Sequence, residues 1–130
     1  LAQLWMEARA CVACAGTATL EAALAGIPMV IAYRTDWLTY SVARRLVHTR
    51  WIGLPNILLR SDAYPECIQV DAEPSRIASA LATAVERPPG FWTEKAREIR
   101  TKMGQPGVAK RVINLAIEMA NTVPHHGIPQ

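Results

Sequence analysis

The sequence has few cysteines and no long apolar run, and each of these absences excludes a class of protein. Three cysteines are an odd number without the spacing of a disulfide framework, which favours a reducing compartment. No stretch reaches the roughly twenty apolar residues that a membrane span requires. The net charge of +3 comes without an extended basic stripe interleaved with aromatic residues, so nucleic acid is not expected as a partner.

Two glycine-rich fingerprints are also missing. The chain contains neither G-x-G-x-x-G nor G-x-x-x-x-G-K-[ST], which counts against a redox dinucleotide site and a phosphate-loop hydrolase. Cys11 and Cys14 have the spacing of a redox pair or of half a zinc site, but only Cys67 and the histidines near the C-terminus remain to complete a zinc site. We expect these cysteines to act as small apolar residues in a strand, and we expect no metal and no cofactor.

The sequence does contain the pattern of an α/β fold. An unbroken run of small apolar residues predicts a parallel strand that is covered on both faces. A glycine turn, a short helix ending at Gly26 and a second strand opened by Pro28 follow it, which is the order of a parallel strand-helix-strand unit. The elements expected in this part are a helix over 2–9, a strand over 10–15, a helix over 17–25 and a strand over 29–33.

The second part of the chain is expected to be mostly helical. The elements predicted there are a helix over 37–48, a short extended piece over 51–59 broken at Pro55-Asn56, a loop over 60–65, and helices from Pro74 to about 87, over 92–103 and over 108–121. Residues 66–70 fit either a turn of helix or a last short strand, because periodicity cannot decide at that length. The apolar positions expected to face inward are Ile77, Leu81, Ala84 and Val85 in the first of these three helices and Val108, Val112, Leu115, Ala116 and Met119 in the last.

The length is that of one domain, expected over 1–122, with a disordered tail over 123–130. The chain opens on Leu1 rather than methionine, and Leu4, Trp5 and Met6 look like the end of a helix already under way. We therefore interpret the sequence as a piece of a longer protein with a Rossmann-like parallel sheet, flanking helices and a helical C-terminus.

The turn Gly16-Thr17-Ala18-Thr19 is the first candidate site. A helix that begins there directs unpaired backbone N–H groups and the positive end of its dipole at whatever lies above the end of the strand, which suits an anion. Glu21 follows about one helical turn later, where its carboxylate can accept hydrogen bonds from sugar hydroxyls. Phosphate and hydroxyl together suggest a nucleotide or a nucleotide sugar. The alternative is an ordinary strand-to-helix turn with a threonine cap.

A basic helix is the second candidate. Between Trp37 and Trp51 the chain carries Arg44, Arg45 and Arg50, and an interfacial helix on anionic lipid headgroups has this composition. The alternative is a helix packed on the core with a solvated basic edge.

Several blocks of the sequence, in order, resemble the C-terminal half of the lipid-A-disaccharide synthase family. The blocks are Gly16-Thr17-Ala18-Thr19-Leu20-Glu21, Pro28-Met29-Val30-Ile31-Ala32-Tyr33-Arg34, Leu38-Thr39-Tyr40, Ala43-Arg44-Arg45-Leu46-Val47, Leu54-Pro55-Asn56-Ile57-Leu58, and Pro65-Glu66 with Gln69. The resemblance implies the C-terminal half of a GT-B glycosyltransferase, in which two Rossmann-like domains face each other and the C-terminal one holds the donor.

The resemblance also implies a reaction and a set of site residues. The reaction is an inverting, metal-independent transfer from UDP-2,3-diacylglucosamine to 2,3-diacylglucosamine 1-phosphate (lipid X), releasing UDP at the cytoplasmic face of the inner membrane. Gly16, Thr17 and Thr19 are expected to bind the diphosphate and Glu21 the ribose. The residues expected to line the donor crevice are Tyr33, Arg34, Asn56, Glu66 and Gln69. The partners expected from the resemblance are the two sugar lipids and a second copy in a homodimer. A membrane surface is a further expected partner, met by Arg44 and Arg45 if the basic helix is interfacial.

Two positions depart from the family pattern. Ala15 stands where the family has serine, which removes one hydroxyl contact, and Leu59-Arg60-Ser61 replaces Ala-Gly-Arg, so a role of that arginine moves to Arg60 or is lost. The acceptor domain with its general base is not in this sequence, so the chain alone is not expected to turn over. The alternatives are another UDP-sugar GT-B transferase or epimerase, and a remnant without catalysis.

Overall fold

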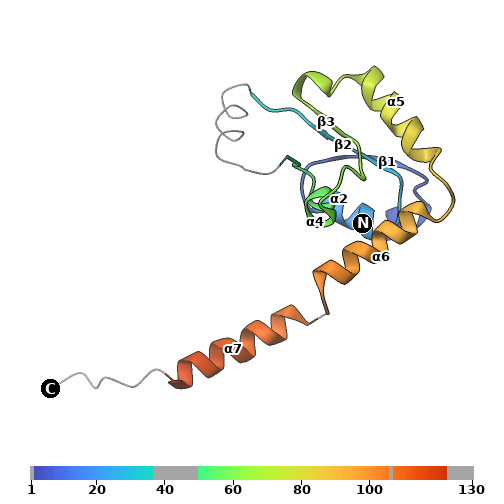
Figure 1. Cartoon of the computed structure of the whole chain (residues 1–130). Coiled ribbons are helices and arrows are strands. Elements are labelled where there is room, and N and C mark those ends of the chain that lie inside the picture. Colours follow the sequence, from blue (N-terminus) through green and yellow to red (C-terminus); the bar gives the residue numbers. More distant parts are fainter. Residues whose placement is uncertain (1, 37–49, 106, 123–130) are drawn as a thin grey trace.

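A three-stranded parallel sheet lies at the centre of the fold (Figure 1). The structure is a computed structural model, and it describes residues 2–36, 50–105 and 107–122. Strands β1 (Cys11–Cys14), β2 (Met29–Tyr33) and β3 (Glu66–Ile68) are ordered β1-β2-β3. Cys11 pairs with Met29 and Ile31 pairs with Glu66, so all three strands run the same way and end at one edge. The expected α/β class is confirmed.

Helices lie on both faces of this sheet. Figure 1 shows α5 on one face and α2, α4 and α6 on the other, and α2 packs against both α4 and α6. The helical elements are α1 (Ala2–Glu7), α2 (Thr17–Leu24), α4 (Leu54–Leu59), the 3₁₀ turn η1 (Gln69–Asp71), α5 (Pro74–Val85), α6 (Phe91–Met103) and α7 (Val108–Thr122). The predicted parallel strand-helix-strand unit is present as β1-α2-β2.

The core is built on the central strand. Met29, Val30 and Ile31 are fully buried, because β2 has a strand on each side and a helix layer on each face. Tyr64 and Trp92 pack their rings beneath it with centroids 4.8 Å apart. The indole N–H of Trp92 donates to the carbonyl of Ala84 at 3.0 Å, which joins α6 to the end of α5.

Strand β1 is less covered than its composition predicts. The side chain of Val12 is 48% exposed and Cys14 is also exposed, while Ala13 between them is buried. The prediction of cover on both faces was wrong for this strand, because β1 is an edge of the described sheet and α5 packs chiefly on β2.

Residues 54–59 form helix α4 rather than the predicted extended piece. Pro55 lies in the first turn of this helix, where its missing N–H has no helical acceptor to lose and its fixed φ suits the helix. The Pro-Asn pair therefore begins a helix here. Residues 66–70 were predicted to form either a turn of helix or a short strand. They form both, because β3 ends at Ile68 and η1 begins at Gln69.

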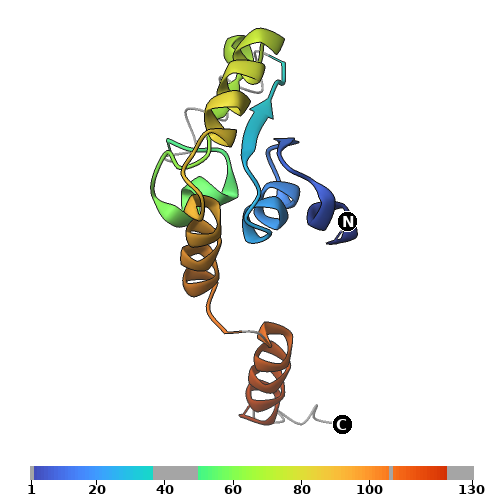
Figure 2. The same ribbon diagram turned by 90° about the vertical axis from the view of Figure 1, so that its right-hand side faces the viewer.

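Helices α5 and α6 follow the prediction closely, whereas the orientation predicted for α7 was wrong. Val112, Leu115 and Met119 are 60%, 57% and 61% exposed, and Ala116 is exposed as well. Figure 2 shows α7 extending away from the sheet and its helices. The apolar period predicts the helix, but it does not place a partner against it. In α5, Val85 is also exposed, although it was predicted to face inward.

Three predictions fall outside the described residues. These are the helix over 37–48 with Arg44 and Arg45, the whole of the blocks Leu38-Thr39-Tyr40 and Ala43-Arg44-Arg45-Leu46-Val47 within it, and the tail over 123–130. Within the described ranges, no helix is both long and apolar enough to cross a bilayer.

Candidate functional site

The carboxyl ends of the three strands bring distant parts of the sequence to one edge of the sheet. Gly16 follows β1, Arg34 and Thr35 follow β2, and Gln69 follows β3. In open α/β sheets, ligands bind outside this edge, because the strands end there and helices begin there. The candidate site is therefore the edge formed by these segments, here called the carboxyl edge.

The Gly16 loop leads from β1 into α2 with a backbone that favours glycine. Its φ is 151°, and a Cβ placed on it would meet nothing within 4 Å. Glycine is needed here for conformation rather than for close packing. The space beside the loop is open, and the exposed Thr17 and Ala18 contribute amides that precede the first hydrogen bonds of the helix.

Thr19 supports this loop from inside. It is fully buried, and its hydroxyl donates to the carbonyl of Gly16 at 2.6 Å while its amide donates to the same oxygen at 3.2 Å. No side-chain hydrogen bond caps the helix at Gly16, so the threonine-cap alternative does not describe this turn. Direct contact of Thr19 with a ligand stays a prediction.

Glu21 lies one turn into α2 and is exposed. One of its carboxylate oxygens accepts a hydrogen bond from the indole N–H of Trp5 at 3.3 Å. Trp5 belongs to α1, so α1 holds the Glu21 carboxylate beside α2. Ala15, where the family pattern has serine, is half-buried and packs against the core.

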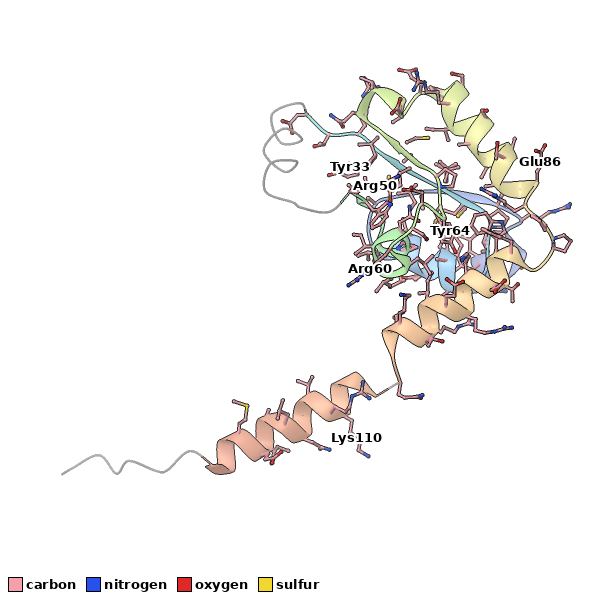
Figure 3. The ribbon with its side chains drawn as sticks, viewed as in Figure 1. Tyr33, Arg50, Arg60, Tyr64, Glu86 and Lys110 are labelled. Carbon is pink, nitrogen blue, oxygen red and sulfur yellow. The ribbon has the colours of Figure 1, made fainter. Side chains whose placement is uncertain are left out.

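Tyr33 ends the central strand and Arg34 follows it, and both residues are exposed. Tyr33 lies where β2 leaves the sheet, as Figure 3 shows. The next residue, Thr35, is fixed by Gln69: the Gln69 side chain accepts from the Thr35 amide at 2.8 Å and donates to the Thr35 carbonyl at 3.0 Å.

Asn56 and Glu66 form an inward-facing cluster with the backbone around them. Asn56 is 1% exposed, and its amide group accepts from Tyr64 N at 2.9 Å and donates to Tyr64 O at 2.7 Å. It also donates to Glu66 Oε1 at 2.8 Å. The Glu66 carboxylate accepts from the amides of Ile52 and Gly53, both at 3.0 Å. These contacts hold the start of α4 to the start of β3.

The structure therefore divides the predicted site residues into two groups. Exposed at the carboxyl edge are Gly16, Thr17, Tyr33 and Arg34, with Glu21 exposed one turn further along α2. Engaged with the chain itself are Thr19, Asn56, Glu66 and Gln69. Sequence reasoning did not identify Thr35, Gly53 or Tyr64. These residues contribute backbone N–H and carbonyl groups, which a pattern of side chains does not reveal.

Arg60, the position to which the role of the family arginine was expected to shift, ends α4. It is exposed and has a left-handed backbone with φ 53°, and its amide donates to the carbonyl of Asn56.

Cys11 and Cys14 lie in β1 as predicted, but Cys11 is half-buried and Cys14 is exposed. Burial raises the pKa of the Cys11 thiol, and burial with the nearby Asp71 raises that of Cys67. A raised thiol pKa means little reactive thiolate at neutral pH. Among the described residues there is no group of three or more His, Cys, Asp or Glu that could hold a metal ion.

A hollow lies at the other end of the sheet. It is lined by residues that precede β1 and β2, among them Trp5, Arg9, Gly26 and Pro28. Because these residues lie at the amino ends of the strands, the hollow is separate from the carboxyl edge.

Comparison with known proteins gives one consistent result. A family model described as lipid-A-disaccharide synthetase matches residues 2–113. The chain is 40% identical over 108 residues to a lipid-A-disaccharide synthase of Geobacter sulfurreducens, covering 80% of this chain and 28% of that protein. It is 51% identical over 73 residues to the lipid-A-disaccharide synthase of Neisseria meningitidis serogroup A, covering 56% of this chain and 19% of that protein. It is 37% identical over 114 residues to the lipid-A-disaccharide synthase of Syntrophus aciditrophicus, covering 86% of this chain and 30% of that protein. The chain thus spans less than a third of these relatives.

Proposed function

This chain belongs to the lipid-A-disaccharide synthetase family, and we propose that it is the donor-binding part of a glycosyltransferase of lipid A biosynthesis. The whole enzyme transfers 2,3-diacylglucosamine from its UDP donor to lipid X and releases UDP. The acceptor site and the general base lie in the part of the longer protein that this chain does not contain, so the chain binds the donor without turning it over.

The observation that carries this proposal is the Gly16 loop at the carboxyl edge. A Cβ on Gly16 would meet nothing within 4 Å, so the loop backbone is accessible, and the first amides of α2 with its dipole favour negative charge there. Negative charge grows on the diphosphate as UDP leaves, so a helix end in this place stabilises the transition state more than the bound donor. Thr17 contacts the diphosphate directly, and Thr19 keeps the loop in shape.

Glu21 binds the ribose in this proposal. Its carboxylate accepts hydrogen bonds from the ribose hydroxyls, and the hydrogen bond from Trp5 keeps it in position. Tyr33 and Arg34 flank the donor from the end of β2, where the Arg34 guanidinium adds a positive charge beside the phosphates.

The first prediction concerns UDP itself. UDP is expected to raise the melting temperature of the 130-residue chain, and Glu21→Ala is expected to weaken UDP affinity by about tenfold or more, because a hydrogen bond to a charged group is lost. Calorimetric titration and thermal unfolding measure these two effects.

Glu86→Ala is the matched control, because Glu86 is an exposed glutamate at the end of α5, away from the carboxyl edge (Figure 3). UDP affinity should be unchanged in this variant. Absence of any UDP-induced stabilisation of the unaltered chain at millimolar concentration would contradict the proposal. In the longer enzyme, a requirement for acylated rather than unacylated UDP-sugars distinguishes this function from that of other UDP-sugar transferases.

A further inference from the structure

Gln69 lies at the point where the pairing of β2 with β3 stops. Tyr33 and Ile68 are the last paired residues of the two strands. Gln69 then takes a left-handed backbone, with φ 54°, and begins the turn η1, so its main chain cannot continue the ladder. A residue with a side chain in this conformation is uncommon, and such strained positions gather at functional sites.

The side chain of Gln69 forms the hydrogen bonds to the chain after β2 that its main chain cannot form. Its amide group accepts from the Thr35 N–H at 2.8 Å and donates to the Thr35 carbonyl at 3.0 Å, both at ordinary hydrogen-bond length. A side-chain amide has the same donor and acceptor pair as a peptide group. Gln69 thereby adds one more rung between β2 and β3, beyond the end of the ladder.

This rung fixes the segment that carries two exposed site residues. Tyr33 and Arg34 expose their side chains at the carboxyl edge, so the backbone on either side determines where they lie. On one side that backbone is held by the β2–β3 ladder, and on the other by the two bonds from Gln69.

We propose that Gln69 is a positioning residue, which acts on the donor through Thr35 and Arg34 rather than by touching it. This inference rests on the proposed function, because it takes the carboxyl edge to be the donor site. It differs from the expectation that Gln69 lines the donor crevice, since both ends of its amide group are engaged with Thr35.

The test uses Gln69→Met, which keeps the length of the side chain and removes both hydrogen bonds. Hydrogen exchange of the Thr35 amide in the free chain is expected to become at least about fivefold faster, because its acceptor is gone. UDP affinity is expected to fall by about fivefold to tenfold, because Arg34 is no longer held in place and its charge-assisted hydrogen bond to the donor weakens. Gln105→Met, at an exposed glutamine between α6 and α7, is the control and should change neither value.

A double-mutant cycle with Arg34→Ala separates positioning from direct contact. If Gln69 acts through Arg34, Gln69→Met costs no further UDP affinity once Arg34 is replaced, whereas losses that multiply would show that Gln69 acts independently of Arg34 and would overturn the inference. Unchanged Thr35 exchange, or unchanged UDP affinity in Gln69→Met, would also overturn it while leaving the proposed function intact. Failure of the unaltered chain to bind UDP would overturn both.

Discussion

Tyr64 shows how one residue contributes through its ring and its backbone rather than through its hydroxyl. It is 1% exposed, its ring packs on Trp92, and Asn56 satisfies both its N–H and its carbonyl. Its hydroxyl is the buried side-chain polar atom without a hydrogen-bond partner within the described residues. Burial, with smaller contributions from Cys11 and Glu98, raises the pKa of Tyr64 above its usual range.

Tyr64→Phe is therefore expected to leave the free energy of unfolding at pH 7 unchanged or to raise it by up to about 1 kcal/mol, since an unpaired buried hydroxyl is removed. The raised pKa favours the neutral phenol in the folded state. The stability that depends on a neutral Tyr64 is present in full below the unfolded pKa of 10.0. It is lost as the pH rises from there toward the higher folded pKa, because the unfolded chain ionises first.

Urea unfolding of both proteins from pH 7 to pH 11 measures this. The unaltered chain should lose more stability than Tyr64→Phe in the alkaline range, because only the unaltered chain carries the Tyr64 phenol. A loss of more than about 1.5 kcal/mol at pH 7 in Tyr64→Phe would show that the hydroxyl has a partner.

At the scale of elements, α4 is held against the sheet at Gly53. A Cβ on this residue would overlap the Cδ1 of Ile31 and come within 3.0 Å of Glu66 Oε1. The Gly53 φ of −78° is open to any residue, so glycine is required for this close approach and not for its backbone conformation. The start of α4 thus lies directly on β2.

Gly53→Ala is expected to lower the free energy of unfolding by about 1 to 3 kcal/mol, the usual cost of overpacking a core. Ile31→Val removes the methyl group that the new Cβ would overlap, so the double variant should be more stable than the sum of the two single losses predicts. Urea unfolding of the four proteins measures the coupling. Strictly additive losses would contradict the packing described here.

The elements that could be predicted from sequence are those with local signals. The small apolar run, the glycine turn and the Pro28 entry predict β1, α2 and β2, and Pro74 predicts the start of α5. Helix α4 was missed because the same proline that breaks a strand also suits the first turn of a helix, and the packing of Gly53 on Ile31 is a tertiary contact that no local signal reports. For α7, apolar spacing predicted a helix but could not show that Val112 and Leu115 are exposed.

At the scale of the whole molecule, the parallel order of three strands creates the candidate site. Segments around residues 16, 34 and 69 meet at one edge because all three strands end there. The sequence motifs identified most of the candidate site residues, but they did not reveal which of their side chains point into the fold. Asn56 and Glu66 bind backbone groups of the chain, and backbone partners leave no trace in a side-chain pattern.

The most direct measurement is to map where UDP binds on the chain. In a titration of the isotopically labelled 130-residue protein with UDP, we expect the largest amide shifts at Gly16, Thr17, Ala18 and Thr35, all at the carboxyl edge. Shifts concentrated instead at Arg9, Gly26 and Ile27, which line the hollow at the amino ends of the strands, would contradict the account, as would a spectrum that UDP leaves unchanged.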